Sequence, residues 1–487
     1  MKQLKVLGII VVIANVVVLA FLMMRQPSNV QPNGMADLVA PLVSDNTMEA
    51  AQYDLSDRGQ KLNVILISLD ALRYDHTGLG GSELGLTPNL DQFAEEAVVF
   101  HDAVSAAPWT LPSHMSVWTA RWPTVHGVTN KLKLLSHDQM VDATLSPGIE
   151  TFPDVLIREG WIAGGFSGGA GVQSMYGFGR GFDTYLDDRY FGGLDYSIPA
   201  ALDWLRKHQD ERFFMFLHGY DTHGQYALAE GGMSSIEYDG TLDGGKEEQA
   251  KLREQGLTKF SNPGEQPLLT EELSEGDADF LEEVYNRKVR DADQRLGGFI
   301  AQLKAMGLME NSVIVLMSDH GDEFMEHGGV DHGFTLYQEQ LHVVMMMRFP
   351  GYTSRHDVRE PVRTIDIFPT VFDVMGIPAP KGVDGQSMRP IMQGQADDRA
   401  IFAESDYRLF VHLRMVRQGK YKLILDLKDG SRELYDLEAD PLEQNDISSS
   451  EPRRTYEMEQ DLRGWLGDMG SNPQDYLGIE QRPITLF

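Results

Sequence analysis

Four residues from three separated segments combine a hydroxyl group with the ligands that a divalent cation needs. Asp70 follows the apolar run 63–69, and Asp319 and His320 follow the apolar run 313–317. A carboxylate beside an imidazole at the end of a strand can offer two ligands to one cation, and Asp70 supplies a third. Mixed oxygen and nitrogen ligands favour zinc or manganese over calcium or magnesium, which prefer oxygen ligands.

The hydroxyl group belongs to Thr110, in the segment 107–116. A free threonine hydroxyl is a poor nucleophile at neutral pH, but coordination to a divalent cation lowers its pKa. A helix beginning after Pro112 would also aim its N-terminal amide groups at an anionic substrate. From these residues alone, the simpler interpretation that Thr110 and Ser113 only cap a helix is the stronger one.

Hydrophobic periodicity predicts the elements that position these residues. Short, nearly continuous apolar runs at residues 63–69, 213–217, 313–317 and 343–348 are typical of strands buried on both faces. Helical patterns separate them at residues 89–98, 197–207 and 280–306. This alternation predicts an α/β fold with a mostly parallel sheet flanked by helices. Ligands bind such sheets beyond the carboxyl ends of the strands, and Asp70, His218 and Asp319 each lie just past a predicted strand.

The amino terminus predicts a membrane anchor. Lys2 and Lys5 precede the apolar run 6–24, which is long enough to span a bilayer. Basic residues on this side favour a cytoplasmic N-terminus. We therefore expect residues 1–25 to form a single transmembrane helix and the catalytic domain to be extracytoplasmic, either periplasmic or extracellular. A cleaved signal peptide is the alternative.

Three further segments follow the predicted anchor. Residues 26–60 are polar, with scattered proline and glycine, and predict a linker. Residues 61–395 form the predicted catalytic domain, in which the Gly- and Glu-rich stretch 230–277 is a surface excursion that could act as a lid. Residues 396–487 predict a small C-terminal α+β subdomain. Its antiparallel sheet is expected from strands at 400–404, 411–417, 421–425 and 433–436, closed by a helix at 453–469.

The composition excludes several classes of function. The 487 residues carry a formal net charge of −31, which repels nucleic acid and anionic lipid headgroups at long range. There is no cysteine, which excludes disulfides, thiolate nucleophiles and Cys-ligated zinc. We therefore expect no nucleic acid as a partner, and the membrane as a partner only through the N-terminal helix.

Motifs along the chain match those of a known family, in order. The sulfatase signature reads Cys or Ser, any residue, Pro, Ser, Arg. Here the corresponding residues are Thr110, Leu111, Pro112, Ser113 and His114, and residues 115–127 continue in register. The other matching segments are 69–75, 218–223, 318–323, 326–328, 332–333, 382–385 and 434–441. From about residue 63 to residue 447 the chain therefore resembles the sulfatase branch of the alkaline phosphatase superfamily. This resemblance implies an alkaline-phosphatase-like fold and a metal-dependent hydrolase of phosphoric or sulfuric esters. The substrate that it implies is an anionic small-molecule, glycan or lipid ester.

The departures from the signature favour a phosphate ester. Sulfatases oxidise the signature Cys or Ser to formylglycine, and Thr110 cannot serve as that precursor. The signature Arg is replaced by His114, and the Lys-Trp-His element of many sulfatases has no counterpart in residues 165–169. A threonine beside an Asp-His pair resembles instead the nucleotide phosphodiesterases, phosphoethanolamine transferases and lipoteichoic acid synthases. We expect hydrolysis of a phosphodiester or phosphomonoester.

The resemblance also implies roles for particular residues. Asp70, Asp319, His320 and the Thr110 oxygen are expected to bind one divalent cation, and Thr110 is expected to form a phospho-threonine intermediate. His223 and His332 are the predicted catalytic histidines, because an imidazole can hold an anion or protonate a leaving oxygen near neutral pH. Roles for four other polar residues stay open: His114, His218, Asp221 and His327. Four more are expected to be structural: Arg73, Asp75, His126 and Asp384.

Three alternatives to a phosphoester hydrolase stay open. One is a sulfatase that tolerates threonine in place of the signature residue. Another is a membrane-associated phosphoethanolamine- or phosphoglycerol-type transferase, although such relatives usually carry several membrane spans. The third is a catalytically silent binding module that retains the fold. The Asp70, Thr110, Asp319 and His320 set argues against the third.

Overall fold

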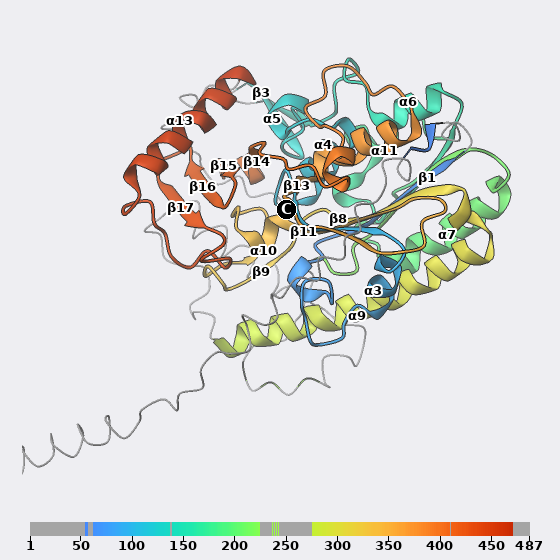
Figure 1. The fold of residues 1–487 in the computed structure, drawn as a ribbon, viewed down its shortest axis with the longest axis horizontal. Coiled ribbons are helices and arrows are strands. Elements are labelled where there is room, and N and C mark those ends of the chain that lie inside the picture. Colours follow the sequence, from blue (N-terminus) through green and yellow to red (C-terminus); the bar gives the residue numbers. More distant parts are fainter. Residues whose placement is uncertain are drawn as a thin grey trace, which may run out of the picture. The chain divides into compact units, whose positions relative to one another are not determined.

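The computed structural model describes residues 54–56, 62–136, 139–224, 275–409 and 411–470, together with the single positions 236, 238, 240 and 242 (Figure 1). The predicted anchor at 6–24 and most of the predicted linker lie outside these residues, as does most of the excursion 230–277. No helix in the described part of the chain has both the length and the apolar character needed to cross a bilayer.

A mixed sheet forms the centre of the fold. Its strands run in the order β12-β2-β11-β8-β1-β7-β5-β6, and β13 also pairs with β2. The pairs β8–β1, β1–β7, β7–β5 and β5–β6 are parallel, whereas β11 is antiparallel to both β8 and β2. The strands are β1 (Asn63–Leu69), β2 (Val98–Val104), β5 (Ile162–Phe166), β6 (Thr184–Leu186), β7 (Phe213–Gly219), β8 (Ser312–Ser318), β11 (His342–Arg348), β12 (His356–Val358) and β13 (Val362–Arg363).

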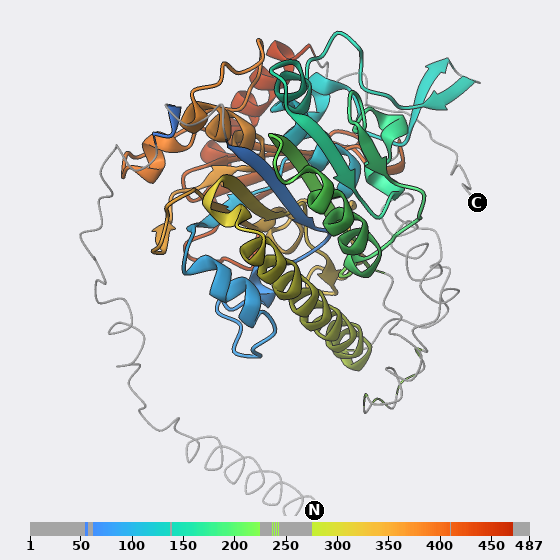
Figure 2. The same cartoon turned by 90° about the vertical axis from the view of Figure 1, so that its right-hand side faces the viewer.

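Helices cover both faces of this sheet, which is why its central strands are apolar throughout. In β1, Val64 and Leu66 pack into one core cluster, and Ile65 and Ile67 pack into the other. Burying such a side chain contributes about 1.5–3 kcal/mol. The first cluster includes α4 (Thr110–Thr119), α6 (Phe152–Arg158) and α11 (Ile367–Met375). The second includes α3 (Pro88–Ala94), α7 (Leu194–His208) and α9 (Glu275–Ala305). Figure 2 shows α7 and α9 running beside each other below the sheet. The predicted α/β fold is confirmed.

A second sheet follows near the carboxyl terminus, as predicted. It is antiparallel, with strand order β14-β15-β16-β17, and α13 packs against it (Figure 1). The elements are β14 (Ile401–Ser405), β15 (Leu413–Gln418), β16 (Tyr421–Asp426), β17 (Arg432–Asp436) and α13 (Pro452–Asp468). Buried Arg414 pairs with Glu404 and Asp406, and Glu404 also accepts a hydrogen bond from the Thr124 amide. This ion-pair network joins the small sheet to the segment that follows α4.

The remaining α-helices and strands of the described residues are short. They are α5 (Pro123–His126), α10 (Gln338–Leu341) and α12 (Arg389–Met392), and the two-stranded pairs β3 (Leu132–Ser136) with β4 (Gln139–Asp142) and β9 (Glu323–Phe324) with β10 (Val330–Asp331).

Two sequence-based expectations for the sheet need correction, and one strand lies where the sequence predicts none. The helix expected at 89–98 ends at Ala94, because Val98 already begins β2. The strand β5 was not expected because its two glycines lower its strand propensity; a Cβ on Gly164 would lie 2.8 Å from Trp204, so glycine is needed for close packing. Finally, β7 continues to Gly219, so His218 lies within a strand and pairs with Ser68 rather than lying past the strand end.

Candidate active site

The carboxyl ends of two adjacent strands bring the predicted metal ligands together. Asp70 follows β1 and Asp319 follows β8, and these parallel strands pair Leu69 with Ser318. Thr110 is the first residue of α4. Its Oγ1 donates a hydrogen bond to Asp70 Oδ1 at 3.0 Å and lies 3.4 Å from His320 Nε2. The four residues predicted from the sequence therefore share one buried cluster.

The cluster suits a divalent cation. Asp70, Asp319 and His320 each place a ligand atom within 4.8 Å of the others. Bonds of about 2.1 Å at tetrahedral angles hold two ligands about 3.4 Å apart, and His320 Nε2 lies 3.5 Å from Asp319 Oδ2. Among the described residues, Asp70 Oδ2 and Asp319 Oδ2 are buried without a hydrogen-bond partner. Burying two such oxygens is costly unless a cation pairs with them.

Electrostatics support the same conclusion. Burial and the neighbouring Asp319 carboxylate raise the pKa of Asp70 to about 8. Burial also disfavours the charged form of Asp319, but the His320 and His114 rings hold its pKa below its ordinary value. Without further positive charge, the two carboxylates resist being ionised together at neutral pH. A divalent cation would supply that charge.

Thr110 is held in place by a loop that the sequence did not identify as part of the site. A Cβ on Gly171 would lie 2.8 Å from Thr110 Cβ, so the backbone there packs directly against the threonine. The Tyr220 hydroxyl accepts a hydrogen bond from the Gly171 amide at 2.8 Å and donates one to the Gly169 carbonyl at 3.1 Å. The only sequence signal for this support is the glycine run that follows β5.

Replacing Gly171 by alanine is expected to lower kcat by about 10²-fold, because displacing a reacting group by about 1 Å has an effect of that size. The added methyl group must push Thr110 away from its present position. Steady-state kinetics on the variant test this expectation. The matched control is Gly298→Ala on α9, where an added Cβ meets no atom within 4 Å. Equal activity in the Gly171 and Gly298 variants would contradict the role of Gly171.

The two predicted catalytic histidines lie beside this cluster. The His332 ring centroid is 4.3 Å from that of His320 and 4.9 Å from that of His223. His332 Nδ1 lies 2.5 Å from Asp322 Oδ1 and 2.8 Å from Asp331 Oδ1. Burial disfavours a charged His332, yet the Asp331 and Asp322 carboxylates hold its pKa well above its ordinary value. The two carboxylates thus favour the protonated form of His332.

His223 is supported by a lysine that gave no sequence signal. Lys288 on α9 donates a hydrogen bond from Nζ to the His223 carbonyl at 2.5 Å. Burial lowers the pKa of Lys288 to about 8, and the Asp322, Asp221 and Asp70 carboxylates oppose that shift. The amino group of Lys288 on α9 thus lies near carboxylates that include Asp70, one of the predicted metal ligands.

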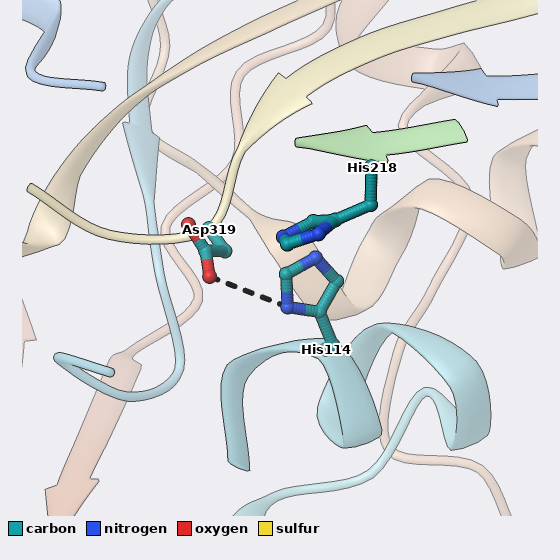
Figure 3. Close-up of side chains that lie close together, drawn as sticks. All are labelled: His114, His218 and Asp319. Carbon is teal, nitrogen blue, oxygen red and sulfur yellow. Dashed lines mark ion pairs between the residues drawn. The ribbon is translucent and has the colours of Figure 1, made fainter. Parts of the chain in front are cut away.

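The residues whose roles the sequence left open fall into two groups. His114 and His218 lie next to Asp319, inside the buried cluster (Figure 3). Asp221 instead pairs with Arg295 at 2.6 Å and accepts a hydrogen bond from the Leu194 amide. His327 lies 2.7 Å from Glu339 Oε1 and 3.0 Å from the Glu443 carbonyl oxygen. The contacts of Asp221 are those of a residue that supports the fold. His327 belongs to a separate group with Glu323 and Glu339, whose ligand atoms lie within 4.8 Å of one another.

The four residues expected to be structural make contacts of that kind. Arg73 pairs with Asp75 at 2.8 Å and also with Glu326. His126 accepts a hydrogen bond from the Val128 amide at 3.1 Å, and Asp384 accepts one from the Trp122 amide at 3.2 Å.

Two protein-family models match the chain. The model named Sulfatase matches residues 62–377, and the model named N-sulphoglucosamine sulphohydrolase, C-terminal, matches residues 325–469. Arylsulfatase K of Xenopus laevis is 20% identical over an aligned length of 478 residues, and the match covers 88% of this chain and 86% of the relative. Delta 4,5-hexuronate-2-O-sulfatase of Bacteroides thetaiotaomicron is 22% identical over an aligned length of 416 residues, and the match covers 80% of this chain and 85% of the relative.

A solved enzyme named for a phosphorus ester, not for a sulfate ester, has the same fold. The crystal structure of the phosphonate monoester hydrolase of Agrobacterium radiobacter superposes with a TM-score of 0.67 and 18% identity, over 84% of this chain and 96% of that one. Because the same fold carries enzymes named for sulfur and for phosphorus esters, the residues of the site must distinguish between them.

Proposed function

Because this chain belongs to the sulfatase family of hydrolases, we propose that it hydrolyses a phosphate ester, a diester or a monoester, with Thr110 as the nucleophile. The observation that carries this proposal is the position of the Thr110 hydroxyl. It is buried at the start of α4, donates to Asp70 Oδ1 at 3.0 Å and lies 3.4 Å from His320 Nε2. A threonine hydroxyl acts directly on phosphorus and needs no conversion to an aldehyde.

Asp70, Asp319, His320 and the Thr110 oxygen would hold one divalent cation, with zinc or manganese favoured by the mixed ligands. When bound, the cation would favour the ionised form of the threonine hydroxyl and neutralise charge on the non-bridging oxygens of the ester. Thr110 begins α4, and the positive end of the helix dipole there would stabilise the same negative charge.

In the first step, Thr110 Oγ1 forms a bond to phosphorus while the bond from phosphorus to the leaving oxygen breaks. The threonine proton moves along its hydrogen bond to Asp70 Oδ1, and His332 gives a proton to the leaving oxygen. In the second step, water attacks phosphorus and loses a proton to His332. The bond from phosphorus to Thr110 Oγ1 then breaks, and the threonine recovers its proton from Asp70. His223 holds the anion beside His332.

Replacing His332 by glutamine is expected to lower kcat by about 10²–10⁴-fold for an alkyl phosphate ester, the usual contribution of a general acid. The loss is smaller for a nitrophenyl ester, whose leaving oxygen needs no proton. Because the pKa of His332 lies above its ordinary value, wild-type turnover of the alkyl ester holds through neutral pH and falls as the pH rises through that raised pKa.

Rate profiles against pH for both esters test this role. The matched control is His208→Gln, since His208 also contacts a carboxylate, Glu211 at 2.8 Å, but on the surface at the end of α7. A merely structural His332 would give equal losses for the two esters and leave the alkaline fall in place.

Hydrolysis of a sulfate ester is the second candidate function. It is favoured by the names of the curated relatives, which are sulfatases matching along most of this chain. One of them is named for a hexuronate 2-O-sulfate, so an anionic glycan ester is the substrate class that both candidate functions share.

We also propose the arrangement along the chain that the sequence predicts. A single N-terminal helix within residues 1–25 anchors the protein, and residues 26–60 link it to an extracytoplasmic catalytic domain at 61–395. Residues 396–487 form the smaller subdomain. The two matched families, which together reach from residue 62 to residue 469, support the division between anchor and body.

A hydrolysis panel on the full-length protein tests the proposed function. It compares nitrophenyl phosphate, bis-nitrophenyl phosphate, a phenylphosphonate ester and nitrophenyl sulfate, with zinc, manganese or calcium added and with a chelator. Turnover of a phosphorus ester that is lost with the chelator supports the proposal. Turnover of nitrophenyl sulfate alone would contradict it and favour the second candidate.

A further inference from the structure

A second group of buried ligands lies behind Thr110. His114 is on α4, one turn after Thr110, and His218 is in β7. Figure 3 shows the His114 ring turned toward Asp319, with the His218 ring above it. The three residues are fully buried, and each places a ligand atom within 4.8 Å of the others.

The unpaired ring nitrogens of His218 are the observation that indicates a bound ligand. Neither of its ring nitrogens has a hydrogen-bond partner among the described residues, although the side chain has no exposure to solvent. Leaving a buried polar group unpaired costs about 1–3 kcal/mol, so such groups are rare and need an explanation. His218 Nε2 points to the acids of the site, since it lies 3.7 Å from Asp70 Oδ1.

His114 has the geometry of a metal-bound histidine. Ser68 Oγ lies 2.9 Å from its Nε2 and is placed to accept a hydrogen bond from an N–H there. A ligating histidine characteristically donates its other ring N–H to such an acceptor. His114 Nδ1 then faces Asp319 Oδ2 at 3.3 Å, close to the separation of about 3.4 Å for two ligands of one tetrahedral cation.

The alternative to a bound cation is a proton on His114 Nδ1. A proton on His114 Nδ1 could be shared between Asp319 Oδ2 and the Thr110 carbonyl oxygen, which lies 3.0 Å from that nitrogen. It would leave both nitrogens of His218 without a partner. A cation accounts for His114, His218 and Asp319 together.

We propose that His114, His218 and Asp319 form a second divalent-cation site, with Asp319 bridging it to the site of Asp70, Thr110 and His320. Two imidazole nitrogens and one carboxylate favour zinc. A second cation at this position places positive charge behind the nucleophile, on the side of the Thr110 carbonyl. Paired sites of this kind hold their ions about 3.5–4 Å apart.

The metal content of the full-length protein tests the second site without any substrate, so its outcome is separate from that of the hydrolysis panel. Protein stripped by chelator and reloaded with zinc is expected to hold about two ions per chain by mass spectrometry of the metal. His218→Gln and His320→Gln are each expected to retain about one. The matched control His126→Gln, another buried histidine, is expected to keep about two.

Wild-type protein with a single zinc ion would overturn the second site, and so would a His218→Gln variant that keeps the wild-type count. If His218→Gln fails to fold, anomalous diffraction at the zinc edge from wild-type crystals decides the question. An anomalous peak is expected within bonding distance of His114, His218 and Asp319. A peak at Asp70 and His320 alone would overturn the proposal.

Discussion

Replacing Thr110 by valine is expected to lower kcat/KM for a phosphorus ester by about 10⁴-fold or more, the scale seen when an enzyme loses its nucleophile. Valine keeps the shape of the side chain and removes only the hydroxyl group. The variant lacks the Thr110 hydroxyl, which donates a hydrogen bond to Asp70 Oδ1 and lies 3.4 Å from His320 Nε2. Kinetics on the purified variant, with its folding checked by circular dichroism, provide the measurement.

Thr119→Val is the matched control for this substitution. Thr119 lies at the other end of the same helix and is equally buried, but its hydroxyl donates only to the Met115 carbonyl, at 2.8 Å. We expect this variant to keep wild-type turnover. If both variants lose activity to the same extent, the effect belongs to packing of α4 and Thr110 is not the nucleophile.

Replacing Asp70 by asparagine is expected to lower kcat/KM by about 10²–10³-fold, the usual loss when one electrostatic contact of the transition state is removed. The substitution removes a buried carboxylate that accepts the Thr110 hydrogen bond and has an unpaired oxygen facing the proposed cation. The bound metal is therefore expected to fall along with the activity. Parallel measurements of metal content and kinetics check both effects.

The control for Asp70 is another buried aspartate. Asp293 on α9 accepts hydrogen bonds from the amides of Asn89 and Leu90 and lies outside the metal-ligand groups. Asp293→Asn is expected to retain both metal and turnover. Full metal content and activity in Asp70→Asn would show that the cation, if one binds, does not use this carboxylate.

The central part of the site can be predicted from the sequence because its acids follow apolar runs. Strands buried on both faces are recognisable, and their carboxyl ends meet at one edge of the sheet. Asp70 and Asp319 are therefore predictable neighbours. Thr110 is not, because a threonine at the start of a helix is usually only a cap; the order of the surrounding motifs identifies it.

The supporting residues depend on tertiary packing and have no comparable pattern. Lys288 reaches His223 from the middle of a 31-residue helix, and that helix shows the periodicity of a surface-packed element along its whole length. Gly171 matters because of its closeness to Thr110, about 60 residues away along the chain. The position of His218 inside β7 follows from register with β1, which the apolar run alone does not specify.

Rapid-quench mass spectrometry of the full-length protein during turnover of bis-nitrophenyl phosphate tests the Thr110 nucleophile most directly. A transient nitrophenylphosphoryl group is expected on Thr110. It should be absent from Thr110→Val and disappear more slowly in His332→Gln. Turnover that leaves Thr110 unmodified at every quench time, or a phosphoryl group on another residue, would contradict the nucleophile on which the proposed function rests.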